Sequence, residues 1–181
     1  MVSTDDAEIA GVAKKWGATV PFYRSEATAN DRAGLADVMV EVVREYDALG
    51  THFSDACCVM ATAPFVTASL LRAAWNVFTE GEWPALLPVV EFGYPIQRAL
   101  RMSSDVLEMI WPENYAMRSQ DLEPTYHDAG MFYFCTRDTV VRDQTLFPPG
   151  ARGFEVSEQR AHDIDTATDW AIAEQKFEIL T

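Results

Sequence analysis

The chain has 181 residues, of which 49% are hydrophobic and 23% are charged, a composition typical of a folded globular protein with a sizeable core. Its 28 acidic and 14 basic side chains leave a formal net charge of −14, which argues against a basic surface for DNA or RNA. No apolar stretch is long enough to predict a membrane span, and the acidic start of the chain argues against a secretion signal.

The beginning of the chain predicts the end of a strand, then a helix, then a short edge strand. Ser3 with Asp6 resembles a capping box, and apolar residues at helical spacing continue to Trp16, which we expect in the core. Gly17 occupies the position of a left-handed helix cap. Residues 18–24 favour a strand but contain a proline, so we expect them near an edge. This is the closing half of a parallel crossover whose opening half we expect to be missing from the chain.

Helices and strands then alternate along the chain. Apolar stripes at helical spacing predict helices at 31–50, 67–81 and 166–180. Apolar and extended runs predict strands at 56–65, 85–92 and 130–135, a hairpin at 94–111 with its turn near Ser103-Ser104, a loop at 146–153 and an extended run at 154–165. The order predicts one α/β domain over residues 1–181, with a mostly parallel sheet covered by helices and a β-rich insertion at about 93–130.

The three cysteines do not predict a disulfide framework. Cys57 and Cys58 are adjacent, so on a strand they would point to opposite faces and could not share a metal ion. Cys135 lies in a separate apolar run. We therefore expect buried free thiols.

The segment "HDIDTATDW" holds the strongest candidates for chemistry. If Asp163 and Asp165 lie at a strand end, their spacing points both carboxylates the same way, and they could hold Mg²⁺ together with phosphate oxygens. The alternative is purely structural: Asp165 and Thr166 cap the last helix, and Asp169 completes a capping box. Both readings stay open on the sequence.

Other polar residues carry weaker signals. His127 and Asp128 are a possible base and its orienting group, although adjacent residues seldom face each other and a hydrogen-bonded loop pair is the default. Gln97 and Arg98 follow a proline turn that can be no more than a solvated hairpin. Arg24 ends a predicted strand, the edge at which α/β proteins bind ligands.

Five motifs stand in one order along the chain: "VSTDDAEIAGVAKKWGATVPFYR", "CCVMATAPF", "FGYPIQRAL", "SQDLEPTYHDAG" and "DIDTATDW". In this order they resemble the acylneuraminate cytidylyltransferases, and most closely the pseudaminic acid branch. The resemblance covers essentially the whole chain. It implies a fold of the nucleotide-diphospho-sugar transferase type, with a small β-rich subdomain used for dimerisation.

The resemblance also implies an activity and its residues. Such enzymes are cytoplasmic, and they join CTP to a nine-carbon acidic sugar, forming the CMP-sugar and pyrophosphate. By this likeness Asp163 and Asp165 hold Mg²⁺, and Arg24 contacts the nucleotide. The remaining implied positions contact the sugar substrate: Thr62, Gln97, Arg98, His127, Asp128, Tyr133 and Phe147.

The sequence departs from the family pattern in three places. Met60 stands where the sialic acid enzymes have a glutamine, which weakens a sialic acid assignment. Met131 stands where the pseudaminic branch commonly has a polar residue, so the exact sugar stays open: pseudaminic acid is favoured, with sialic and legionaminic acid as alternatives. The glycine-rich basic segment that precedes "VSTDD" in the family, and that cradles the triphosphate, is expected to be missing here. An active cytidylyltransferase and a non-catalytic remnant therefore both stay open.

Overall fold

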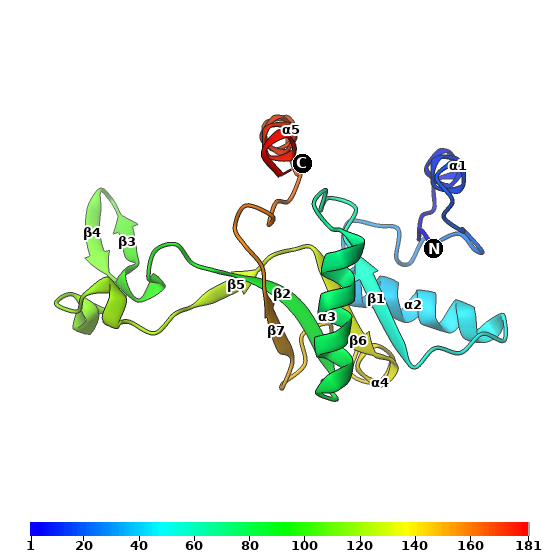
Figure 1. Cartoon of the computed structure of the whole chain (residues 1–181), viewed down its shortest axis with the longest axis horizontal. Coiled ribbons are helices and arrows are strands. Elements are labelled where there is room, and N and C mark those ends of the chain that lie inside the picture. Colours follow the sequence, from blue (N-terminus) through cyan, green and yellow to red (C-terminus); the bar gives the residue numbers. More distant parts are fainter. Residues whose placement is uncertain (181) are drawn as a thin grey trace. The chain divides into compact units, whose positions relative to one another are not determined.

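A computed structural model describes residues 1–180 of the chain (Figure 1). Its elements follow in the order α1 (Ala7–Lys15), α2 (Leu35–Ala48), β1 (Asp55–Val59), α3 (Ala68–Glu80), β2 (Ala85–Glu91), η1 (Ile96–Arg98), β3 (Leu100–Ser103), β4 (Val106–Met109), η2 (Pro112–Asn114), η3 (Ser119–Asp121), β5 (Tyr126–Asp128), β6 (Phe132–Thr136), α4 (Arg137–Val141), β7 (Arg152–Glu155) and α5 (Ala167–Leu180), where η marks a 3₁₀ turn.

The chain forms two compact units, and each is described by itself. Unit one comprises Met1–Val59, Ser69–Leu86 and Phe132–Arg152. Unit two comprises Met60–Ala68, Leu87–Met131 and Gly153–Thr181. The single domain with an insertion at about 93–130 stays a prediction.

The strands of the main sheet lie in the order β1-β6-β2-β5, and β7 also pairs with β2. β6 is antiparallel to both β1 and β2, and β5 is antiparallel to β2. β1 and β2 therefore point the same way, as a crossover through α3 requires, but β6 lies between them. The predicted α/β class is confirmed. The expected parallel pairing is corrected, because β6 enters the sheet between the two crossover strands in the reverse direction.

One face of the strands in unit one is covered by α2 and α4. Met39, Val40 and Val43 of α2 form a buried cluster with Cys135 of β6 and Val140 of α4. Alternate residues of a strand point to opposite faces, so this cluster takes only every second side chain of β1 and β6. Met39 and Val43 belong to the apolar stripe that helical spacing predicts for α2, and Val40, which lies outside that stripe, packs beside them.

The opposite face in unit one is aromatic and is covered by α3 (Figure 1). The ring centroid of Phe134 lies 5.7 Å from that of Phe78 and 5.6 Å from that of Trp75, both on α3. The neighbouring ring of Phe132 lies 5.7 Å away in an edge-to-face arrangement. Three layers, helix–sheet–helix, therefore enclose the core of unit one.

Pro88 divides β2 between two partners. Before it, Ala85 and Leu86 pair with β6, and after it residues 89–91 pair with β5. Pro88 has no N–H group to donate, although its carbonyl accepts from the N–H of Ala129 at 3.0 Å. The missing donor coincides with the point at which β2 changes partner.

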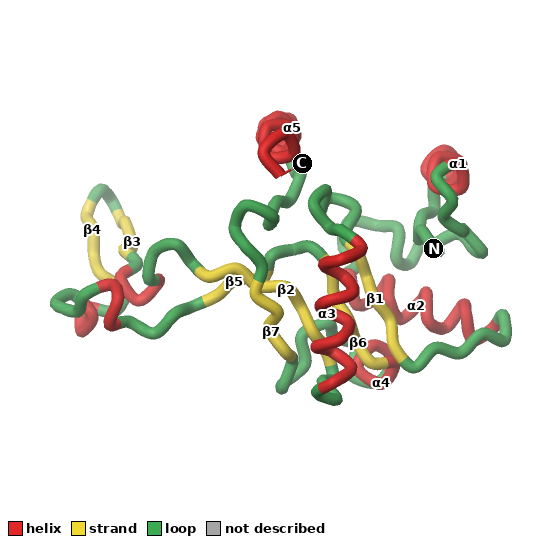
Figure 2. The backbone as a smooth tube through the Cα atoms, viewed as in Figure 1, coloured by secondary structure: helices red, strands yellow, loops and turns green. Residues whose placement is uncertain are grey.

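Unit two contains the predicted hairpin, formed by β3 and β4. Ser104 and Asp105 make its turn with φ of 48° and 67°, the left-handed conformation that a two-residue hairpin turn requires. The turn lies one residue later than predicted. Two loops join the hairpin and its 3₁₀ turns to β2 and β5 (Figure 2).

The first helix begins later than predicted, and it is more exposed to solvent than predicted. Its cap is Asp6, not Ser3: the Asp6 carboxylate accepts from two N–H groups of the first turn at 2.7 and 2.9 Å. Gly17 has the predicted left-handed φ, 88°. The prediction that Trp16 lies in the core is wrong, because its side chain is 83% exposed and α1 buries only Ala10.

Two predicted extended segments do not form strands over their length. Residues 18–24 make two backbone bonds to the start of the chain and bend at Pro21, which has no N–H to extend the ladder. The run 154–165 leaves β7 after Glu155, because the carbonyl of Ser157 accepts from two later N–H groups and closes a turn.

The three thiols are free, as predicted, but they are not all buried. Cys57 and Cys58 point to opposite faces, since they pair with successive residues of β6. Cys135 is fully buried, and burial raises the pKa of its thiol to about 12. Cys57 is exposed, which corrects the prediction for that residue.

Replacing Phe134 with alanine should lower the free energy of unfolding by about 3–5 kcal/mol, because the ring is buried and its loss leaves a cavity among other aromatic rings. Urea unfolding followed by fluorescence and circular dichroism measures the loss. Phe147→Ala is the matched control: its ring is 71% exposed, so its effect should stay within about 0.5 kcal/mol. Equal losses in the two variants would contradict the packing described for β6.

Candidate functional site

Three segments that carry predicted site residues meet in unit two. The N–H of Ile164 donates to the carbonyl of Thr62 at 3.1 Å. A Cβ placed on Gly130 would lie 3.8 Å from Oδ2 of Asp163. The loop after β1, the turn before β6 and the acidic segment before α5 therefore lie together, although they are far apart in the sequence.

The turn between β5 and β6 is held by its own aspartate. Oδ1 of Asp128 accepts from the N–H of Gly130 at 2.8 Å, and Gly130 has a left-handed φ of 63°. Met131 follows, and its carbonyl accepts from the N–H of Met60 at 2.9 Å. The Met131 side chain is fully buried, so this departure from the family pattern fills the core of unit two.

His127 and Asp128 do not form a base and its orienting group. Nδ1 of His127 donates to the backbone carbonyl of Asp128 at 2.8 Å, not to the carboxylate. The His127 ring lies 4.9 Å from that of Phe92, centroid to centroid. The geometry is that of the hydrogen-bonded loop pair that the sequence favours. A contact of either residue with substrate stays a prediction.

Asp163 and Asp165 lie in the loop between β7 and α5, not at a strand end. Both are exposed, and in the part of the chain that the structure describes neither carboxylate pairs with a cation or accepts a hydrogen bond. Residues 1–180 also contain no group of three or more His, Cys, Asp or Glu arranged to hold a metal ion. Two free carboxylates fit Mg²⁺, which usually binds through one or two carboxylates and completes its shell with water and substrate phosphates.

The capping box predicted for the last helix is also present. The N–H of Asp169 donates to Oγ1 of Thr166 at 3.2 Å, and Oδ2 of Asp169 accepts from the N–H of Thr166 at 2.8 Å. The N–H of Asp165 also donates to this oxygen, at 3.2 Å. Oδ2 of Asp169 also accepts from the hydroxyl of Thr166 at 2.7 Å, and this bond, followed by the bonds from the N–H groups of Thr166 and Asp165, lowers the pKa of Asp169. The structural and metal readings are therefore compatible, because Asp169 accepts the capping bonds and leaves the Asp165 carboxylate free.

Gln97 and Arg98 lie on η1 and bind neighbouring segments of unit two. Nε2 of Gln97 donates to the carbonyl of Glu123 at 2.9 Å, and its Oε1 is buried without a partner among the described residues. Nη1 of Arg98 donates to Oγ of Ser119 at 3.4 Å, and its guanidinium lies 6.0 Å from the ring centroid of Tyr94. Both side chains thus hold the loops around the hairpin, and their contact with substrate stays a prediction.

Arg24 lies in unit one beside the start of the chain. Its N–H donates to the carbonyl of Thr4 at 2.9 Å, and its Nη2 donates to the carbonyl of Ser3 at 3.5 Å. Nη2 also lies 3.9 Å from Oδ1 of Asp5. The buried Nε has no partner among the described residues, so the guanidinium keeps a donor for a ligand.

Tyr133 and Phe147, also in unit one, have different surroundings. Tyr133 lies opposite Cys58 and packs against the buried cluster under α2. Phe147 is exposed in the loop after α4, where its N–H donates to Oγ1 of Thr145 at 3.1 Å. Their roles at the sugar stay predictions.

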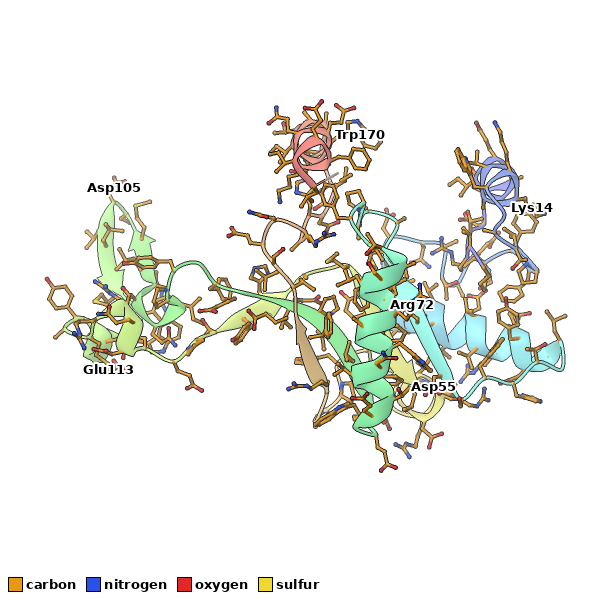
Figure 3. The ribbon with its side chains drawn as sticks, viewed as in Figure 1. Lys14, Asp55, Arg72, Asp105, Glu113 and Trp170 are labelled. Carbon is orange, nitrogen blue, oxygen red and sulfur yellow. The ribbon has the colours of Figure 1, made fainter. Side chains whose placement is uncertain are left out.

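An apolar groove in unit two was missed by the sequence reasoning. It has a volume of about 530 Å³ and is lined by Pro64, Phe65, Ile164, Trp170, Ala173, Glu174, Phe177 and Glu178. Figure 3 shows the indole of Trp170 projecting from the side of α5. The spacing of Trp170 and Phe177, seven residues apart on one helix, was the available signal. The groove adjoins the acidic segment because Ile164 belongs to both.

Comparison with known proteins shows what the chain resembles. No profile of a known protein family matches it. It is 33% identical over 180 residues to a pseudaminic acid cytidylyltransferase of Campylobacter jejuni, covering 99% of this chain and 78% of that protein. It is 24% identical over 187 residues to a CMP-N,N'-diacetyllegionaminic acid synthase of Legionella pneumophila, covering 99% and 78%.

A solved structure shares the fold. It is a CMP:2-keto-3-deoxy-manno-octonic acid synthetase complexed with CTP, with a TM-score of 0.64 and 14% identity. The match covers 99% of this chain and 79% of that one. At this identity the likeness bears on the fold alone, and it agrees with the predicted α/β class.

Asp169→Asn should speed hydrogen exchange at the amides of Asp165 and Thr166 at neutral pH, because the charged acceptor of both is lost. The pKa of Asp169 is lowered in the folded chain, so its stabilising effect is present above the pKa of an unfolded aspartate and is lost as the pH falls through the folded pKa. In that acid range the exchange rates of these two amides should become equal in the parent chain and in Asp169→Asn. Glu174→Gln, further along α5, is the control; a difference that persists in acid would contradict the capping assignment.

Proposed function

The chain belongs to the acylneuraminate cytidylyltransferase family, and we propose that it transfers CMP from CTP to a nine-carbon acidic sugar, pseudaminic acid first, with release of pyrophosphate. The observation that carries this proposal is the 33% identity to a pseudaminic acid cytidylyltransferase across 99% of the chain. The meeting of three motif segments in unit two supports it, because residues expected to act together are held close by backbone hydrogen bonds.

The proposed reaction is a nucleotidyl transfer. The anomeric hydroxyl oxygen of the sugar attacks the α-phosphorus of CTP, and the bond from that phosphorus to the bridging oxygen of the pyrophosphate breaks. The hydroxyl gives up its proton, and pyrophosphate leaves with the bonding electron pair. In such a displacement the protein acts mainly by holding the two reactants in line.

Asp163 and Asp165 are the proposed ligands of Mg²⁺. When bound, the ion would neutralise charge on the phosphates and orient them. The two carboxylates suit this role because both are exposed and neither is neutralised by a described cation. The backbone bond from Ile164, the residue between them, to Thr62 fixes the loop that carries both.

The remaining site residues are proposed to contact the substrates. Arg24 contacts the nucleotide, and the donor that its buried Nε leaves unused supports this assignment. The sugar contacts are assigned to Thr62, Gln97, Arg98, His127, Asp128, Tyr133 and Phe147. Among these, Thr62 is the best supported, since its carbonyl bonds the acidic loop.

The identity of the sugar has a specific alternative. The 24% identity to a legionaminic acid synthase and the methionine at position 131 favour testing legionaminic acid beside pseudaminic acid, whereas Met60 makes sialic acid the weaker candidate. A chain that does not bind CTP tightly in the presence of Mg²⁺ and that turns over none of these sugars would instead be the non-catalytic remnant.

The proposed partners are small molecules and a second copy of the chain. No helix in the described part of the chain has the length and apolar character to span a membrane. The net charge of −14 makes nucleic acid an unsuitable partner. A CTP-consuming reaction is proposed to take place in the cytoplasm.

The hairpin of unit two is the proposed dimer surface. On one face it carries Leu100 and Met102 of β3 opposite Met109 and Leu107 of β4. Leu100, Met102 and Leu107 are 55%, 69% and 60% exposed. A two-stranded hairpin is marginally stable alone in water, so an uncovered apolar face favours pairing with another surface.

Incubated with CTP, Mg²⁺ and pseudaminic acid, the chain should release pyrophosphate, as measured by a coupled phosphate assay. Asp163→Asn and Asp165→Asn should each lower the rate by at least about 100-fold, because each removes a charged metal ligand. Binding of Mg²⁺, measured by calorimetry, should weaken in parallel.

Asp105→Asn is the matched control for these two variants. Asp105 lies at the tip of the hairpin (Figure 3), and asparagine tolerates its left-handed backbone. Its rate should be unchanged. The metal assignment is refuted if both Asp163→Asn and Asp165→Asn retain full activity and Mg²⁺ affinity.

Met102→Glu should weaken self-association by at least about 100-fold, because a two-fold interface loses the apolar contact twice. Sedimentation over a range of concentrations measures the dissociation constant. Ser103→Glu adds the same charge to the opposite face of β3 and should leave association unchanged. Equal effects of the two variants, or a monomeric parent chain, would rule out this face.

A further inference from the structure

The segment that follows Arg24 is held to α2 by one carboxylate. Residues 25–34 contain no helix or strand. Oε1 of Glu41 accepts from the N–H of Ser25 at 2.7 Å, and Oε2 accepts from Oγ of Ser25 at 3.0 Å and from Oγ1 of Thr28. Among residues 1–180, Glu41 is the one side chain of α2 that bonds the first turn of this segment.

The rest of the segment is held by local side chains. Asn30 donates to the carbonyls of two earlier residues at 3.1 and 2.8 Å and accepts from the N–H groups of two later ones. Asp37 accepts from the N–H of Gly34 at 2.9 Å, at the start of α2. The loop therefore has internal order, and Glu41 supplies its connection to the helix.

Arg24 is held from both directions along the backbone. On one side its N–H donates to the carbonyl of Thr4, a buried residue, at 2.9 Å. On the other side comes Ser25, whose N–H and hydroxyl both bond Glu41 and whose carbonyl accepts from the N–H of Thr28 at 3.1 Å. A residue fixed on both sides has little freedom to rotate its backbone, so the direction of its Cα–Cβ bond is set, and the bond from Nη2 to the carbonyl of Ser3 at 3.5 Å restrains the guanidinium at the far end of the side chain.

We propose that Glu41 is a positioning residue, which clamps Ser25 and Thr28 and thereby fixes Arg24 for contact with CTP. This role rests on the proposed function, in which Arg24 binds the nucleotide. Glu41 acts through Arg24 and makes no contact with substrate of its own.

The charge state of Glu41 suits this role. Burial acts to raise its pKa, but hydrogen bonds from Thr28 and Ser25, together with the positive charge of Arg24, outweigh burial and lower the pKa below its ordinary value. The carboxylate is therefore ionised at neutral pH, and an ionised oxygen is the stronger acceptor for both hydroxyls and the N–H.

The test is a double-mutant cycle on binding of CTP with Mg²⁺, measured by calorimetry on the whole chain. Glu41→Ala should raise the dissociation constant about tenfold, the loss expected when a charged acceptor is removed. In an Arg24→Ala background the same change should alter the constant by less than about twofold, because the group it positions is gone. Glu41→Gln, which keeps one acceptor oxygen, should recover part of the affinity.

Two further measurements distinguish a positioning role of Glu41 from a general contribution to the stability of the fold. The KM for CTP should rise in Glu41→Ala while the KM for the sugar stays unchanged. Hydrogen exchange at the Ser25 amide should speed up, whether or not nucleotide is present. Glu45→Ala is the matched control. Glu45 lies one turn further along α2, lines with Glu41 a hollow of about 410 Å³, and forms no ion pair with a described residue.

The outcomes distinguish this role from the proposed function. If Arg24→Ala weakens CTP binding and Glu41→Ala does not, the positioning role is overturned and the nucleotide role of Arg24 stands. If the two losses add fully, Glu41 acts by another route and the proposal is likewise overturned. If Arg24→Ala binds CTP as tightly as the parent chain, Arg24 does not contact the nucleotide. The positioning role of Glu41, which depends on that contact, is then overturned as well.

Discussion

The pairing of β6 with both β1 and β2 is the constraint on which the rest of the structure depends. Because β1 and β6 are antiparallel, the residue after β1 lies beside the residue before β6, and Met60 and Met131 are joined by a backbone hydrogen bond. The loop after one strand and the turn before the other are thereby brought together. A parallel arrangement would have placed the start of β6 at the other end of β1.

This reversal gives the acidic segment its neighbours. Asp163 lies against Gly130 at the entry to β6, and Ile164 bonds the loop after β1. Backbone hydrogen bonds join the segments of the site, but the two carboxylates are not neutralised by any described cation. Exposed charges of like sign add nothing to the stability of the fold, and the cation proposed to arrive with the substrate would relieve their repulsion.

Much of this could be predicted from periodicity and short motifs. The helix α2, the strands β1 and β2, the hairpin and the capping box at Asp169 follow from local spacing, which acts within a few residues. The burial expected for β1 is not observed, because its residues are half-buried or exposed. Strand direction could not be predicted in this way, since β6 reads as an apolar run in either orientation. The exposure of Trp16 also depends on what covers α1, and the role of Glu41 depends on a loop with no regular period.

The overall charge limits how such a chain can bind a polyphosphate. With a net charge of −14, the long-range field opposes a triphosphate, and attraction must come from local groups. Arg24, the residue proposed to contact the nucleotide, is one such cation, but its guanidinium already lies 3.9 Å from the Asp5 carboxylate and interacts electrostatically with the Glu41 carboxylate. A single shared cation cannot balance several phosphate charges. The divalent ion proposed at Asp163 and Asp165 would turn the acidic character into a binding contribution, because carboxylates that repel free CTP attract its magnesium complex.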